Sequence, residues 1–161
     1  EVDYQRVSDK AHSKDEASIR TLLNRPTSTD TIAKIRLELG TTMNENVAVF
    51  RTNEGMQKAL SKIKELKERG QKAHVRDKGK IFNTGLIFAM ELDFMLELAE
   101  VITVSALDRK ESRGAHYRLD FPDRDDDAWQ KHTLSFSSSD GPRLDYLPVT
   151  ITRWPAERRV Y

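Results

Sequence analysis

The feature that most constrains this sequence is its longest apolar-rich segment, residues 83–117. Between residues 86 and 102 apolar side chains cover most of a helical circumference and leave a narrow acidic strip of Asp93, Glu97 and Glu100. A helix that is apolar on nearly every side must be surrounded by other helices. The segment therefore predicts the central helix of a bundle, capped by Asn83. On this reading an aspartate in place of Leu98 should prevent folding.

Two amphipathic helices are predicted ahead of this segment, near the N-terminus. The first helix begins at Ser13, which has the spacing of a capping box with Glu16 and is followed by an apolar stripe. It ends before Pro26, because a proline disfavours helical geometry at the residue that precedes it. Thr29 or Asp30 can cap the second helix, whose apolar residues recur at three- and four-residue spacing. Residues 1–12 are polar and unpatterned, which is typical of a tail or linker.

Glycines indicate where the second and third helices pack or end. Gly40 interrupts the second helix, and a glycine there favours close packing against a neighbour. Asn53 caps a third helix with one apolar and one basic face, and Gly70 is expected to end it in a left-handed conformation. We interpret the basic face as solvated surface.

The helical pattern stops at Gly114. Residues 132–136 and 144–146 alternate between apolar and polar, and residues 137–141 between them predict a hairpin loop. The predicted fold class is mainly α: a three- to four-helix bundle, like a spectrin repeat, followed by an irregular tail with a short β-hairpin. We expect three parts: a linker and first helix (residues 1–28), the bundle (29–118) and the tail (119–161).

Composition excludes several function classes. The net charge of +1 offers no global field for nucleic acid or an anionic membrane, and the absence of cysteine excludes disulfides and cysteine-ligated metals. No apolar run approaches the roughly 18–20 residues that span a bilayer. The sequence begins without methionine or a signal-peptide pattern, and we interpret it as a piece of a longer protein.

The cluster at residues 109–118 has two interpretations. As a functional group, Arg113 and His116 can bind an anion or move protons. As a structural group, Arg109 and Lys110 complement the dipole at the end of the long helix, and Gly114 caps it. The residues alone favour the structural interpretation.

A second charged segment, residues 123–127, is rich in aspartate. With His116 and His132 these carboxylates can ligate a divalent metal, but the spacing matches no calcium loop and no paired-histidine motif. A charged turn that pairs with Arg118 and Arg124 is the favoured interpretation.

The aromatic and basic tail, residues 154–161, can stack on bases, but docking against a partner is the commoner use of such residues. The sequence contains no dinucleotide-binding glycine motif, P-loop or nucleophile elbow, so it shows no set of catalytic residues of its own.

Several segments occur in the order of a known family. They are residues 38–40 (ELG), 43–44 (MN), 49–52 (VFRT), 78–84 (KGKIFNT), 89–92 (AMEL), 95–101 (MLELAEV), 106–116 (ALDRKESRGAH), 120–126 (DFPDRDD), Trp129 and 132–133 (HT). Over residues 32–161 the chain resembles the C-terminal domain of the succinate dehydrogenase/fumarate reductase flavoprotein subunit. The Glu-Ser-Arg-Gly-x-His motif is the most specific part of this resemblance.

The resemblance implies a parent subunit that binds FAD and interconverts succinate and fumarate in electron transport and the tricarboxylic acid cycle. In the family, the flavin- and substrate-binding motifs lie in the larger N-terminal part. No catalytic, cofactor-binding or metal-binding residue is therefore carried over to this chain. The implied partners are the FAD-binding domain, an iron–sulfur subunit and, indirectly, a membrane anchor, at the cytoplasmic face of the cell membrane.

The resemblance also gives the charged cluster a docking role. We expect a domain or partner interface formed by Arg109, Glu111, Arg113, His116, Arg118, Asp120, Trp154 and Arg158. Two alternatives are the equivalent domain of L-aspartate oxidase or adenylylsulfate reductase, and an independent helical interaction module.

Overall fold

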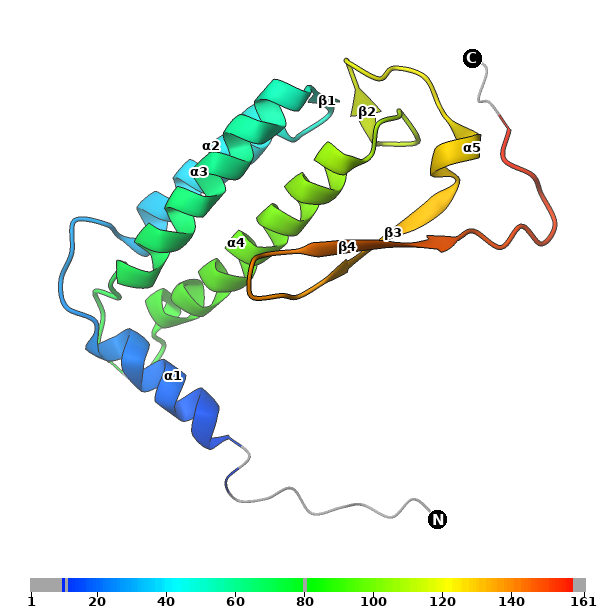
Figure 1. The fold of residues 1–161 in the computed structure, drawn as a ribbon. Helices are drawn as coiled ribbons and strands as arrows, with labels where there is room; N and C mark the ends of the chain where they lie inside the picture. Colours follow the sequence, from blue (N-terminus) through cyan, green and yellow to red (C-terminus); the bar gives the residue numbers. More distant parts are fainter. Residues whose placement is uncertain (1–9, 11, 80, 158–161) are drawn as a thin grey trace, which may run out of the picture. The chain divides into compact units, whose positions relative to one another are not determined.

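The computed structural model describes residues 10, 12–79 and 81–157 and is mainly α, as predicted (Figure 1). Its elements are α1 (Ser13–Asn24), α2 (Ile32–Asn46), β1 (Phe50–Arg51), α3 (Asn53–Lys72), α4 (Thr84–Asp108), β2 (Tyr117–Arg118), α5 (Asp126–Trp129), β3 (Lys131–Phe136) and β4 (Arg143–Pro148). The chain divides into a first unit, residues 1–43 with 61–99, and a second unit, residues 44–60 with 100–161.

The first unit has an apolar core supplied by its helices. Ile35 of α2 and Ile63 and Leu66 of α3 are completely buried, and Leu92 of α4 is 1% exposed. The same cluster includes Leu22 of α1. The spacing of apolar side chains along one face of α2 and of α3 therefore identified core positions correctly.

Arg69 links α2 and α3 within the first unit. Its guanidinium donates to both carboxylate oxygens of Asp30 (3.1 and 2.7 Å), to both of Glu38 (2.7 and 2.8 Å) and to Glu65 (2.9 Å). The hydrogen bond from Arg69 is the largest influence on the pKa of both Asp30 and Glu38, and it lowers each to about 2. This network fixes the register of two neighbouring helices with paired charges.

The predicted caps were right for α4 and displaced elsewhere. The Asn83 Oδ1 accepts from the backbone N–H of Leu86 at 2.8 Å, which confirms it as the N-cap. The hydroxyls of Thr31 and Thr52 accept the capping bonds of α2 and α3, so the predicted caps at Thr29 or Asp30 and at Asn53 were wrong. The capping box at Ser13 was also wrong, because residue 12 occupies the N-cap position and makes no side-chain capping bond.

The predicted roles of two helical glycines were also wrong. No atom lies within 4 Å of a Cβ built on Gly40, so it marks no close contact. Gly70 lies inside α3, which ends only at Lys72, and its built Cβ lies 3.1 Å from a methyl of Leu96. The close helix–helix approach therefore lies at Gly70 instead of Gly40.

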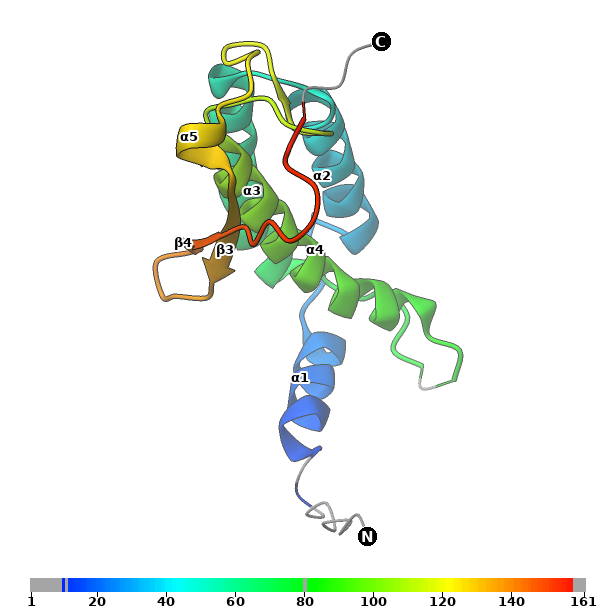
Figure 2. The same ribbon diagram turned by 90° about the vertical axis from the view of Figure 1, so that its right-hand side faces the viewer.

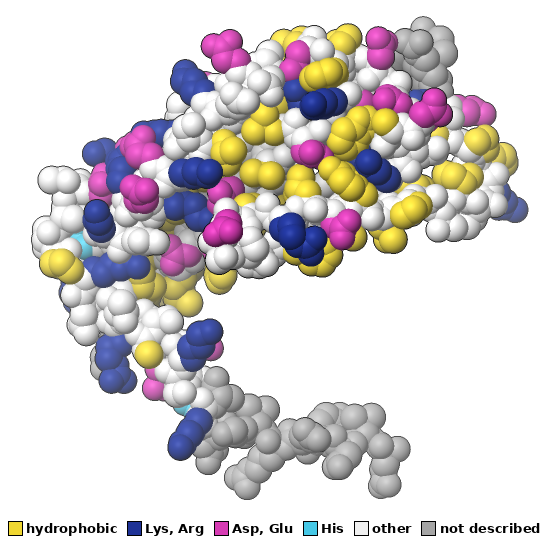
Figure 3. Space-filling model, viewed as in Figure 1, with side chains coloured by type: hydrophobic (Ala, Val, Ile, Leu, Met, Phe, Trp, Pro, Cys, Tyr) yellow, Lys and Arg dark blue, Asp and Glu magenta, His cyan; other side chains and the backbone are white. Residues whose placement is uncertain are grey.

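The expectation that α4 is surrounded on all sides was wrong. Ile87, Phe94 and Leu98 are 52%, 66% and 59% exposed. They lie seven and then four residues apart and so share one face of the helix. Because Leu98 is exposed, an aspartate there does not enter a core, which removes the reason to expect misfolding. Hydrophobic side chains reach the surface among charged ones in Figure 3.

The second unit contains both strand pairs. β1 and β2 pair in parallel, with Phe50 opposite Tyr117 and Arg51 opposite Arg118. β3 and β4 form the predicted antiparallel hairpin (Figure 2), and Gly141 supplies the positive φ (108°) in its loop.

Candidate functional site

A tight turn follows α4 and places the charged cluster. The backbone N–H groups of Arg113 and His116 each donate to the carbonyl of the other (2.8 and 3.0 Å), and Gly114 between them has a φ of 59°. This left-handed conformation favours glycine. Gly114 lies six residues beyond Asp108, the last residue of α4, so the prediction that it caps the helix was wrong.

Arg118 performs the capping instead. Its side chain is 1% exposed, and its Nη1 donates to the carbonyl oxygens of Ala106, Leu107 and Arg109 at 2.9, 3.0 and 3.2 Å. Its Nε and Nη2 donate to the two carboxylate oxygens of Asp120 at 2.7 and 2.6 Å. This bidentate pair lowers the pKa of Asp120 to about 2. A guanidinium thus satisfies the free carbonyls and complements the dipole at the end of α4.

Glu111 is the buried anion of the cluster. It is completely buried and accepts from Arg109 (2.6 Å), from Arg113 (2.9 and 3.0 Å) and from the backbone N–H of Asp125 (3.0 Å). Burial works to raise its pKa, but the hydrogen bonds outweigh burial and the pKa is lowered. Glu111 is therefore a structural carboxylate with no role as a proton acceptor at neutral pH.

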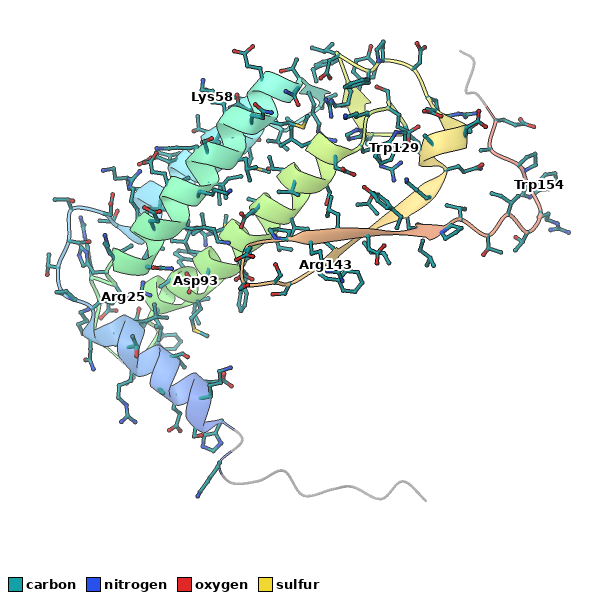
Figure 4. All side chains as sticks on the ribbon, viewed as in Figure 1. Arg25, Lys58, Asp93, Trp129, Arg143 and Trp154 are labelled. Atoms are coloured by element: carbon teal, nitrogen blue, oxygen red, sulfur yellow. The ribbon has the colours of Figure 1, made fainter. Side chains whose placement is uncertain are left out.

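Arg109 connects the end of α4 to the hairpin segment. Besides Glu111, it donates to the carbonyls of Trp129 (2.8 Å) and Lys131 (2.7 Å) and to the hydroxyl of Thr133 (3.0 Å). Its guanidinium lies 5.1 Å from the centre of the Trp129 ring, which Figure 4 labels. These contacts place β3 beside the charged cluster.

His116 is held as a neutral imidazole. Its Nδ1 lies 2.7 Å from an Nη of Arg51, and its Nε2 lies 3.2 Å from the carbonyl oxygen of Arg109. Because a guanidinium only donates, Nδ1 must accept, and Nε2–H donates to the carbonyl. Burial lowers the pKa of His116, and the charges of Arg51, Arg118 and Arg109 lower it further.

The aspartate-rich segment forms a charged turn. Its predicted pairing with Arg124 is confirmed, but the predicted pairing with Arg118 was wrong, because Arg118 pairs with Asp120 and Arg113 takes its place. Asp125 caps α5 by accepting from the N–H of Ala128 at 2.9 Å, and Asp126 pairs with Arg113 and Arg124. Across residues 10, 12–79 and 81–157, no group of three histidine, cysteine or acidic side chains is arranged to hold a metal ion.

The structure brings together six of the eight predicted interface residues: Arg109, Glu111, Arg113, His116, Arg118 and Asp120. Trp154 is 78% exposed on the C-terminal segment (Figure 4), and Arg158 lies outside the described residues. The contacts of the six are made within the chain. Whether they also face another domain stays a prediction.

The sequence reading missed a pocket in the second unit, which we call the basic pocket. It has a volume of about 470 Å³ and is lined by Arg51, Arg109, His116, Lys131, His132 and Thr133, with an apolar side at residues 101, 102 and 106. Arg51 lies 65 positions from His116, so no local pattern indicates that they meet.

The fold defines a mainly α domain with an appended β-hairpin, and its charged cluster is internally paired. Residues 36–161 match the family described as fumarate reductase flavoprotein C-term. The chain therefore belongs to this family. Within its described part, none of the helices is long and apolar enough to cross a membrane.

Individual relatives agree with the family. The chain is 43% identical over 152 residues to the fumarate reductase flavoprotein subunit of Haemophilus influenzae, covering 94% of this chain and 25% of the relative. It is 42% identical over 138 residues to the succinate dehydrogenase flavoprotein subunit of Rickettsia conorii, covering 81% and 23%. The chain thus spans about a quarter of the length of these relatives.

Solved structures share the fold. A mutant of the E. coli quinol fumarate reductase chain FrdA superimposes with a TM-score of 0.85 and 40% identity, covering 98% of this chain and 28% of that one. An adenosine-5-phosphosulfate reductase superimposes with a TM-score of 0.75 at 22% identity, covering 94% of this chain and 26% of that one. The second likeness shows the shared fold alone.

Proposed function

We propose that this chain is the C-terminal domain of a flavoprotein subunit that interconverts succinate and fumarate with FAD and passes electrons to an iron–sulfur subunit. Its family membership and its 43% identity to a fumarate reductase flavoprotein subunit support this. The chain itself serves as a supporting domain. Its buried carboxylate and arginines are committed to internal pairs, which leaves them unsuited to proton transfer.

We infer that the described residues of this chain do not form the FAD site. A dinucleotide is typically held by a glycine-rich turn that leads directly into a helix, where backbone N–H groups meet the pyrophosphate. The positive-φ glycines among the described residues, Gly114 and Gly141, lie in a loop turn and a hairpin. We place FAD in the part of the parent subunit outside this chain.

In the proposed organisation, residues 1–28 lead from the FAD domain, residues 29–118 form the supporting bundle, and residues 119–161 contact the parent or the iron–sulfur subunit. The subunit lies at the cytoplasmic face of the cell membrane and reaches the membrane anchor only indirectly. The charged cluster at residues 109–120 forms the rim of the contact with the FAD domain.

The observation that carries the supporting role is the exposed stripe of α4, formed by Ile87, Phe94 and Leu98. Apolar side chains spaced along one helical face and more than half exposed indicate a surface that another domain covers. Burying such side chains contributes roughly 1.5–3 kcal/mol each.

The test compares two exposed leucines in the whole flavoprotein subunit. Leu98→Asp should release FAD and abolish succinate oxidation, because it places a charge in the proposed contact. Leu37→Asp on α2, where the leucine is 72% exposed, is the matched control and should retain both. Both variants of the 161-residue chain should melt at the wild-type temperature.

Equal activity of the Leu98→Asp and Leu37→Asp subunits would contradict the supporting role. Tight binding of RNA or DNA by the isolated chain, with a steep salt dependence, would instead favour an independent interaction module.

A further inference from the structure

The basic pocket carries more positive than negative charge. Arg51, Arg109 and Lys131 are the arginine and lysine side chains that line it, and the lining includes no carboxylate. Glu111 pairs with Arg109 but is completely buried and takes no part in the lining. The excess charge therefore faces the open side of the pocket.

Arg51 lacks a carboxylate partner among the described residues. Its Nε donates to the carbonyl of Val47 at 2.8 Å, and an Nη donates to His116 Nδ1 at 2.7 Å, so both acceptors are neutral. A guanidinium has five N–H donors, and these two bonds leave others free. Burial and the charge of Arg118 both lower the pKa of Arg51, which means that its surroundings disfavour an isolated cation.

Lys131 is held in place without a carboxylate partner among the described residues. Its ammonium lies 4.7 Å from the ring centre of Trp129 and 3.9 Å from that of Tyr146. Cation–π contacts fix the position of an ammonium but do not neutralise it. Two cations from different elements, β1 and β3, thus line one pocket.

The apolar side of the pocket narrows the choice of ligand. Val101, Ile102 and Ala106 lie along it, which suits a short carbon chain beside a charged group. The pocket has a volume of about 470 Å³ and is open to solvent, so a small carboxylate can reach it directly. A nucleic-acid backbone fits poorly, because Arg113 and Arg118 outside the pocket are already paired with carboxylates.

We propose that the basic pocket is a carboxylate-binding site in which Arg51 and Lys131 hold a carboxylate whose carbon chain lies against Val101 and Ile102. This goes beyond the supporting role proposed above, and only the second arm of its test rests on the parent subunit proposed there. Charge-assisted bonds to a guanidinium are among the stronger hydrogen bonds in proteins. The carboxylate belongs to a small free acid or to an acidic side chain from the rest of the parent subunit.

The first arm of the test titrates the isotopically labelled 161-residue chain with sodium succinate, with sodium chloride matched for ionic strength. Succinate should produce saturable NMR shifts at the Arg51 Nε–H and the His116 ring, and should raise the pKa of His116. Arg51→Gln should weaken binding at least tenfold. Arg153→Gln, an exposed arginine outside the pocket, should bind like the wild type. Lys131→Met tests the site independently if Arg51→Gln fails to fold.

The second arm identifies the source of the carboxylate from a crystal structure of the whole subunit. A free acid against Arg51 identifies a solute site, and an aspartate or glutamate from another part of the subunit identifies a docking site. Either result supports the proposal. It is overturned if succinate gives no saturable shift and the crystal shows only water at Arg51.

Discussion

Replacing Arg118 with methionine tests whether a buried guanidinium holds the end of α4. Methionine keeps much of the aliphatic packing but removes all five hydrogen bonds of the side chain, three to carbonyls at or just beyond the end of α4 and two to Asp120. Removing one partner of a buried ion pair costs about 3–5 kcal/mol. Asp120 is 30% exposed and keeps a bond from the N–H of Asn53, so water and that bond offset part of the loss. We expect a loss near the lower end, about 3 kcal/mol.

Urea and thermal unfolding followed by circular dichroism measure this loss. For a chain of this length, about 3 kcal/mol corresponds to a fall in Tm of roughly 6–12 °C. Arg143→Met is the matched control, because Arg143 is 60% exposed and lies 3.9 Å from Asp145. Exposed pairs of this kind contribute about 0–1 kcal/mol.

A double variant separates the capping role from simple packing. If Arg118 compensates Asp120, adding Asp120→Asn to Arg118→Met should cost less than the sum of the two single changes, because no unpaired carboxylate remains. A loss below about 1 kcal/mol for Arg118→Met, or strict additivity in the double variant, would refute the reasoning.

Three further predictions concern titratable groups and glycines. The pKa values of Asp120 and Glu38 are lowered to about 2, so these carboxylates stabilise the fold above their ordinary pKa values of 3.8 and 4.5, and this stabilisation is lost as the pH falls towards 2. Acid titration of the folded signal should show the loss, and unchanged stability from pH 5 to 2 would contradict it. The hydrogen bond to the carboxylate of Asp108 raises the pKa of Tyr146 from 10.0 to about 12, so this bond stabilises the fold below pH 10 and the stabilisation is lost as the pH rises through 12. In unfolding measurements, Tyr146→Phe should flatten this alkaline loss of stability. Gly40→Ala should stabilise the chain by about 0.5–1 kcal/mol, whereas Gly114→Ala should destabilise it by about 1–2 kcal/mol because Gly114 has a positive φ. Urea unfolding midpoints that shift in the same direction for both variants would refute this prediction.

Much of the local structure could be predicted from the sequence. Asn83 caps α4 because an asparagine before an apolar run is a local signal, and the Asp-Gly step in residues 137–141 places the hairpin turn. The caps of α2 and α3 lay a residue or two from the predicted positions, because several neighbouring polar residues can accept the same bond. Asp30 is instead drawn to Arg69, 39 positions away, and no local pattern contains that contact.

The same distinction applies to the candidate site, where contacts between residues close in sequence could be predicted and contacts between distant residues could not. Its members from Arg109 to Asp120 are close in sequence, so their clustering was visible. Which of them caps the helix depends on how the chain turns back at Gly114, which has a left-handed conformation, before Arg118 reaches the carbonyl of Ala106. Arg51 reaches the cluster through the β1–β2 pairing, which involves two residues per strand and leaves no detectable alternation.

The ion pairs inside the charged cluster determine which surface residues can contribute most to the free energy of binding a partner. Arg109, Arg113 and Arg118 already have carboxylates within the chain, so a new contact to them must compete with existing pairs and gains little net free energy. The α4 stripe offers apolar area that burial stabilises without breaking any bond, and Arg51 offers an unneutralised charge. The free energy of association should therefore depend more on Leu98 and Arg51 than on the conspicuous Glu-Ser-Arg-Gly-x-His motif, whose charged side chains are paired within the chain.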